Sequence, residues 1–233
     1  YQCCSTKGAI YSRWKFRMNA PQIIPLFSTP LFVHEQEVTS VDFEFIKNTK
    51  HIDINYSESH FKNGAGSTSE GSYLLNHSEM SSLKDKILNS VKEYAHGVMQ
   101  VGEEVEFYIT RSWSTIHKEG DYAFPHSHAN SLLSGVMYIN VPKDDESLVE
   151  FMAPSNHTLF PLLQPRLKEH NIWNHRIFCF KPETGSIIIF PSNLVHSTTP
   201  MTSSTSLRYI VGFDIFVRGE FKINDAHLDG PVS

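Results

Sequence analysis

The chain has 233 residues, of which 40% are hydrophobic and 12% are aromatic, so it can bury a sizeable core as one domain. Its formal net charge of -5 offers no basic surface for nucleic acid. No apolar run approaches the roughly 18 residues that a membrane-spanning helix needs. These features favour a soluble enzyme or binding domain, for which a homodimer is the commonest oligomer.

The first residues differ in character from the rest. Segment 1–17 holds two of the three cysteines and lacks the apolar core of a signal peptide, and Met18 opens an ordinary start sequence. We therefore expect 1–17 to be a non-native leader and 18–233 to form a single domain. Cys179 is then the sole native cysteine, which favours a reducing, cytoplasmic compartment, although export without disulfides is also compatible.

The first predicted elements are a strand and a loop. Prolines near the start of the stretch 26–38 are compatible with a short extended strand there. Residues 57–72 are rich in Ser and Gly and have no periodicity, so we expect a long surface loop.

A helix is predicted from Ser81 to Gln100. Its apolar residues recur at steps of three and four, which indicates one apolar face packed on the outside of a sheet. Ser82 with Asp85 would form the N-terminal cap. Gly97 or Gly102 would end the helix.

The later part of the chain changes to strand chemistry. Its β-branched and aromatic runs are VEFYITRSWSTI, SLLSGVMYINV, SLVEFM, HRIFCF, GSIIIF and SLRYIVGFDIFV. One helix followed by many strands predicts a mainly β fold with flanking helices, either a β-sandwich or a jelly roll.

Two histidines two positions apart begin the candidate site. In FPHSHANSLL, His126 and His128 would point to the same face of an extended strand. The alternative is a polar strand end with two exposed imidazoles. A second segment, GSIIIFPSNLVHSTTP, places His196 after an apolar strand and a tight turn, in the order that a barrel rim requires.

The three histidines together indicate an open metal site. Three imidazoles would leave about half of an octahedral Fe(II) site free for a substrate and O₂. Structural zinc usually takes four ligands and recruits thiolates, whereas the chain has no C-x-x-C motif. We therefore predict His126, His128 and His196 as metal-binding and catalytic residues.

Arg208 is the second notable residue, because it lies in SLRYIVGFDIF among apolar neighbours. A buried guanidinium needs a partner, and a carboxylate can accept two parallel hydrogen bonds from it. The partner is either the carboxylate of a bound ligand or a structural one, Asp214 or Glu150.

The motifs H-x-H, SGVMYIN, GSIIIFPSNLVH and the following Arg together resemble the 2-oxoglutarate- and Fe(II)-dependent oxygenase superfamily. From about residue 22 to 218, the chain is similar to a group of uncharacterised bacterial and phage oxygenases related to prolyl hydroxylases. The resemblance implies a double-stranded β-helix, a cupin-like jelly roll. It also implies a hydroxylase that uses Fe(II) and 2-oxoglutarate, which it converts to succinate. His126 and His196 match the family's metal ligands.

The same resemblance assigns a cosubstrate pocket. It implies that Arg208 binds the distal carboxylate of 2-oxoglutarate and that Tyr138 assists. A phenol donor beside a guanidinium would complete such a pocket. Ser134 and Asn130 are further candidates, either for the wall of this pocket or for a place behind the metal ligands.

His128 departs from the superfamily pattern, which normally has H-x-D. An imidazole in place of a carboxylate leaves the site one unit more positive and removes a hydrogen-bond acceptor. Either His128 is a true third ligand, as in the narrower group, or it lies behind the ligands and Asp121 or Glu150 replaces it.

Two other functions fit parts of the sequence. A three-histidine cupin dioxygenase shares the barrel, but cupins usually have a glutamate ligand where this chain has Leu132 and Leu133, and Arg208 would have no role. A non-catalytic binding protein on the same barrel is the second alternative. The expected partner is a small-molecule or peptide substrate. Its specificity would come from region 143–180, with Asp144, Asp145, Phe160, Arg166, Lys168 and Trp173.

Overall fold

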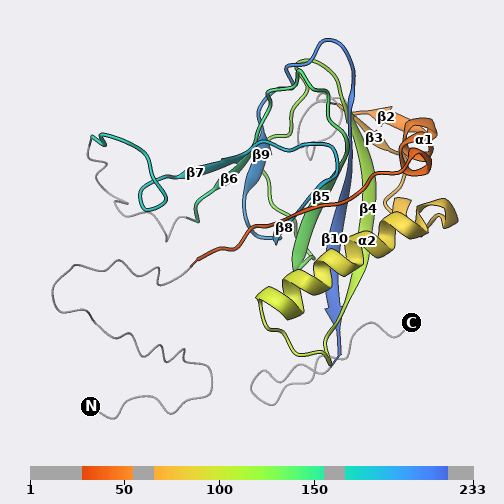
Figure 1. The fold of residues 1–233 in the computed structure, drawn as a ribbon, viewed down its shortest axis with the longest axis horizontal. Coiled ribbons are helices and arrows are strands. Elements are labelled where there is room, and N and C mark those ends of the chain that lie inside the picture. Colours follow the sequence, from red (N-terminus) through yellow and green to blue (C-terminus); the bar gives the residue numbers. More distant parts are fainter. Residues whose placement is uncertain (1–27, 55–65, 155–165, 220–233) are drawn as a thin grey trace.

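The computed structural model describes residues 28–54, 66–154 and 166–219. Over these ranges the chain forms two antiparallel sheets and flanking helices (Figure 1). The strands are β1 (Phe32–Glu35), β2 (His51–Asp53), β3 (Ser67–Ser69), β4 (Glu106–His117), β5 (Leu133–Asn140), β6 (Val149–Met152), β7 (Ile177–Phe180), β8 (Ser186–Pro191), β9 (His196–Thr198) and β10 (Arg208–Arg218). The predicted leader, 1–17, lies outside the described residues.

The larger sheet has the order β1-β8-β5-β10-β4-β3-β2, and the smaller sheet has the order β7-β6-β9. All six predicted strand runs form strands. The predicted mainly β fold with flanking helices is confirmed as a double-stranded β-helix, in which the smaller sheet covers one face of the larger one.

Strands at the middle of the larger sheet are buried on both faces, which explains their nearly continuous apolar sequences. In β8, Ile187 and Ile189 join the core beneath the helices, whereas Ile188 and Phe190 pack between the sheets. Alternation along a strand therefore separates two cores. In β5, Tyr138 faces the inter-sheet core.

The same alternation in β10 directs polar residues inward. Tyr209, Val211, Phe213 and Ile215 belong to the core beneath the helices. The residues between them, beginning with Arg208 and ending with Asp214, face the space between the sheets, as Ile210 does. This inward face carries the candidate site.

The helices cover the outer face of the larger sheet (Figure 1). They are α1 (Ser40–Asn48), α2 (Ser81–Lys92), a π-helical turn (Glu93–Val98) and two short 3₁₀ turns (Leu74–Asn76 and Ser78–Met80). Leu83, Ile87 and Val91 of α2 are fully buried against the sheet, as the periodicity predicted. None of the helices in the described ranges is long and apolar enough to cross a membrane.

Three local predictions were wrong. The helix has Met80 at its N-cap with no side-chain hydrogen bond, because the preceding 3₁₀ turn leads directly into it, so Ser82 and Asp85 form no cap. It ends at Val98, where Gln100 rather than a glycine takes a positive φ of 55°. The predicted loop lies partly outside the described residues, and its later part forms β3, because its Ser and Thr residues pair with β2 and β4.

Candidate active site

The three predicted histidines meet at one end of the space between the sheets. His126 and His196 exchange both backbone hydrogen bonds, at 3.0 and 2.9 Å, and the His128 amide donates to the Ser192 carbonyl at 2.9 Å. These bonds hold the H-x-H segment beside the turn that precedes β9. As a result, one ring nitrogen from each histidine lies within 4.8 Å of the other two.

Hydrogen bonds fix which nitrogen of each ring is free. Nδ1 of His126 lies 2.7 Å from the Phe124 carbonyl, and Nδ1 of His196 lies 3.0 Å from the Leu194 carbonyl. Nδ1 of His128 lies 2.7 Å from the Asp214 carboxylate. Because these oxygens can only accept, each Nδ1 carries the proton and each Nε2 keeps a lone pair for a metal.

Burial favours the neutral form of two of the three imidazoles. It lowers the pKa of His126, and it lowers the pKa of His196 to about 3, with the other imidazoles adding to the effect. The neutral ring is the form that binds metal, so these two rings can bind a metal at neutral pH. Phe190, with its ring centroid 4.6 Å from that of His196, supplies part of the apolar wall.

Trp113 supports the third histidine. Its ring stacks on His128 with centroids 5.8 Å apart. Across the sheet it lies directly over Gly212, where a Cβ would come within 2.6 Å of the indole. Only glycine at position 212 lets the indole lie this close to the strand.

No fourth His, Cys, Asp or Glu of the described ranges joins the cluster. A structural zinc site would be closed by four ligands, whereas three imidazoles leave coordination positions open. Asp121 accepts a hydrogen bond from the Lys118 amide, and Glu150 accepts one from Ser197, so neither replaces His128 in the triad. The fold and this open triad define a candidate metal site on a double-stranded β-helix, with coordination positions left for further ligands.

Arg208 lies at the other end of the same inward face and is only 2% exposed. Its Nη1 bonds to Asp145 Oδ2 at 3.2 Å and to the Ser147 hydroxyl. The structural partners predicted for it, Asp214 and Glu150, were wrong, because Asp145 comes from the loop after β5, whose path the sequence does not reveal. Nε and Nη2 of Arg208 are buried and have no partner.

His117 is a residue of this pocket that the sequence did not indicate. It pairs with Arg208 across β4 and β10, and its buried Nδ1 also has no partner. Burial and the nearby guanidinium lower its pKa to about 3, so the ring is neutral and can donate from Nδ1. The period-two pattern of RSWSTIH, the second half of β4, could have predicted that His117 faces inward, because this segment ends opposite Arg208.

Tyr138 is the other buried donor near Arg208. Burial raises its pKa to about 12, against the opposing effect of the guanidinium, so the phenol stays protonated. Unpaired buried donors are rare and costly. Arg208 and His117 therefore form a buried cluster with unpaired nitrogens that fits an anionic acceptor, as the distal carboxylate of 2-oxoglutarate would be.

Of the two remaining predicted residues, Ser134 lies in one of its two predicted places and Asn130 lies in neither. The Ser134 hydroxyl donates to Asp214 at 2.8 Å, so it lies behind His128. Asn130 is exposed and has a positive φ of 61°, which identifies it as a turn residue.

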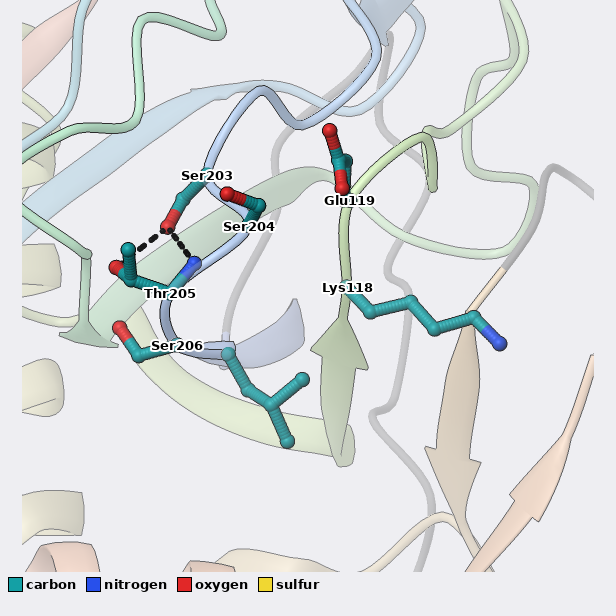
Figure 2. A pocket seen from close by; sticks show the side chains of 7 residues that line it. Lys118, Glu119, Ser203, Ser204, Thr205 and Ser206 are labelled. Atoms are coloured by element: carbon teal, nitrogen blue, oxygen red, sulfur yellow. Dashed lines mark hydrogen bonds between the residues drawn. The ribbon is translucent and has the colours of Figure 1, made fainter.

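A separate surface pocket lies at the end of β4 and has a volume of about 390 Å³ (Figure 2). Lys118 follows β4 and Leu207 precedes β10, and both line this pocket. The Ser203 hydroxyl is already bonded to Asp144 and Thr205. In Figure 2 the Lys118 side chain points away from the serines. This pocket is not part of the histidine site.

Comparison with known proteins identifies the class more narrowly. Residues 111–214 match the family described as putative 2OG-Fe(II) oxygenase. This segment contains all three histidines, His117, Tyr138 and Arg208. A search of the curated proteins found no match.

Solved structures share the fold at low sequence identity. The α-ketoglutarate-dependent carbocyclase SnoK from nogalamycin biosynthesis has a TM-score of 0.55 at 11% identity, covering 87% of this chain and 90% of its own. A 2OG-Fe(II) oxygenase family oxidoreductase from Burkholderia pseudomallei has a TM-score of 0.50 at 11% identity, with coverage of 74% and 76%. HygX from Streptomyces hygroscopicus, solved with nickel, 2-oxoglutarate and hygromycin B, has a TM-score of 0.50 at 13% identity, with coverage of 80% and 82%.

Residues 111–214 of the chain are therefore similar to the 2OG-Fe(II) oxygenases, a family of oxidoreductases. The predicted cofactors, Fe(II) and 2-oxoglutarate, are those of this family, and the open triad and the unpaired donors at Arg208 fit them.

Proposed function

We propose that His126, His128 and His196 bind Fe(II) through Nε2, and that Arg208, Tyr138 and His117 bind the distal carboxylate of 2-oxoglutarate. The observation that carries this proposal is the pairing of two incomplete sites on one inward face. At one end three ring nitrogens have free lone pairs. At the other end three buried nitrogens of Arg208 and His117 have no hydrogen-bond partner.

When bound, Fe(II), 2-oxoglutarate and O₂ would convert a substrate C–H bond into C–OH, with succinate and CO₂ as the other products. The protein orients the reactants and excludes water. The Arg208 guanidinium would keep Asp145 on Nη1 and offer Nε and Nη2 to the cosubstrate. Phe190 and Phe151, which pack beside His196, would keep the reacting centre dry.

We expect the substrate to be a small molecule or a peptide that is hydroxylated. The HygX complex supports this, because that protein holds hygromycin B together with a metal and 2-oxoglutarate. Within region 143–180, Ile172 and Trp173 are exposed apolar side chains that could contact such a substrate. Phe160, also predicted there, lies outside the described residues.

The three-histidine cupin remains the function to test against, since it would use the same triad without 2-oxoglutarate. Purified protein loaded with Fe(II) in air should convert 2-oxoglutarate to succinate slowly without substrate, and faster with a true one. His196→Ala should abolish this turnover, whereas the exposed His77→Ala should retain it. Fe(II)-dependent activity on a substrate with no succinate formed would favour the cupin.

We also expect a reducing, cytoplasmic compartment and a homodimer. The one cysteine in the described ranges, Cys179, is free and exposed. Light scattering on the full chain would measure the oligomer, and a monomeric mass would contradict the dimer.

A further inference from the structure

Asp214 is a buried carboxylate placed directly behind a metal ligand. It lies on the inward face of β10, its side chain is 2% exposed, and its Oδ1 lies 2.7 Å from Nδ1 of His128. The other two histidines have backbone carbonyls as their Nδ1 acceptors. His128 alone of the three is backed by a charge.

The carboxylate is itself held in place from the neighbouring strand β5. Ser134, which pairs with Asp214 across β5 and β10, donates its hydroxyl to Oδ1 at 2.8 Å. Ser134 is linked in turn to Ser192, whose backbone carbonyl binds the His128 amide. The ring and the backbone of His128 are thus fixed through one connected network.

A structural ion pair does not account for Asp214. The basic side chain that faces it is Arg111, whose Nη1 is 3.9 Å from Oδ2 and whose side chain is 57% exposed. A pair at that distance, with one partner largely in water, contributes little. Burying a carboxylate is expensive without strong hydrogen bonds, and its closest ones are to His128 and Ser134.

The charge has a clear use at this position. The superfamily's H-x-D pattern places a carboxylate directly on the metal, whereas this chain has His128 there. A hydrogen-bonded carboxylate makes the opposite ring nitrogen a better donor and stabilises a cation bound to it. Asp214 would thus supply a negative charge behind His128, where the H-x-D pattern has a carboxylate on the metal itself.

We propose that Asp214 is a positioning residue that orients His128 and supplies the negative charge that the absent ligand carboxylate would have provided. The inference rests on the proposed function, because it takes His128 as a metal ligand. It also gives Ser134 a role, as the residue that holds Asp214.

A double-mutant cycle on the full-length protein tests this with Mn(II) as the probe, measured by calorimetry. Asp214→Asn should weaken Mn(II) binding about 10- to 100-fold, the usual effect of losing a carboxylate behind a ligand. In a His128→Asp background, which restores the ligand carboxylate, Asp214→Asn should change the affinity by less than about 2-fold. A purely structural role would give the same loss in both backgrounds, because the interaction with His128 would not matter.

Glu150→Gln is the matched control, since Glu150 also bonds to a hydroxyl near the triad but contacts no histidine ring. Its Mn(II) affinity should equal that of the wild type. If the wild type binds no Mn(II), the proposed function itself fails. If the wild type binds Mn(II) and Asp214→Asn binds equally well, only the role of Asp214 is overturned.

A second measurement needs no folded Asp214 variant. Nitrogen-15 NMR of the metal-free wild type, with His128 assigned by comparison with His128→Asn, should show the proton on Nδ1 with a strongly downfield shift. A His128 ring protonated on Nε2 instead would overturn the proposal.

Discussion

The histidine end and the Arg208 end of the inward face differ in whether their buried nitrogens have hydrogen-bond partners. At the histidine end each Nδ1 has an acceptor, so the rings are oriented before a metal binds. At the Arg208 end three buried nitrogens have no hydrogen-bond partner. The first end is fixed by the protein alone, whereas the second is incomplete until an anion joins it. Metal binding should therefore tolerate loss of the unpaired nitrogens at Arg208 and His117, whereas leaving those nitrogens buried and unpaired lowers the stability of the metal-free protein.

The largest effect is expected at the histidine end. His196→Ala removes the most buried ligand, so Fe(II) or Mn(II) affinity should fall at least roughly 100-fold. Metal content after desalting would measure it, with His77→Ala as the control. A variant that still holds stoichiometric metal would remove His196 from the site.

The Arg208 end should respond differently. Arg208→Ala should weaken 2-oxoglutarate binding by about 1.5 to 3 kcal/mol, or about 10- to 150-fold, because hydrogen bonds to a charged group are lost. Calorimetry on Mn(II)-loaded protein would measure it, and Mn(II) affinity should be unchanged. Arg208→Lys keeps the charge beside Asp145, so it controls for the stability lost when that carboxylate is left unpaired. Unchanged 2-oxoglutarate affinity in both variants would remove Arg208 from the pocket.

The free energy of unfolding should fall at acid pH because His117 is buried as a neutral ring. Its pKa is about 3 in the folded chain and about 6.5 when unfolded. The unfolded chain therefore binds the proton more readily between these values, and stability is complete above pH 6.5 and falls toward pH 3. The free energy of unfolding, measured in urea at pH 7, 6 and 5, should fall with decreasing pH in the wild type. Below pH 6 this fall should be smaller in His117→Gln by about 1.4 kcal/mol per pH unit. Identical slopes would mean that His117 is not buried as a neutral ring.

The smallest effect is expected for Ser134→Ala, which tests whether Ser134 supports the histidine site or the cosubstrate site. Ser134→Ala removes one hydrogen bond to Asp214, worth about 1 kcal/mol, so Mn(II) affinity should fall up to about 5-fold. If Ser134 instead lines the cosubstrate pocket, the other place that the sequence left open for it, 2-oxoglutarate affinity would fall and Mn(II) affinity would not. Two titrations of one variant separate these outcomes.

Much of this arrangement was predictable because it depends on local pattern. The H-x-H spacing predicted that His126 and His128 lie together, although the pair lies outside the strands and is held by an isolated bridge from His126 to His196. The long apolar strands were clear from their sequences. The short β2, β3 and α1 were not predicted, because a few residues carry little periodic signal. The roles of Asp145, His117 and Asp214 depend on contacts between residues 63, 91 and 86 positions apart in the chain. Such contacts follow from strand register, which the sequence of a single strand does not define.

The most direct test is an anaerobic optical titration of the Fe(II)-loaded protein with 2-oxoglutarate. The account predicts a visible charge-transfer band that saturates at one 2-oxoglutarate per iron, is absent in His196→Ala and requires higher 2-oxoglutarate in Arg208→Ala. Stoichiometric Fe(II) binding with no such band at any 2-oxoglutarate concentration would contradict it.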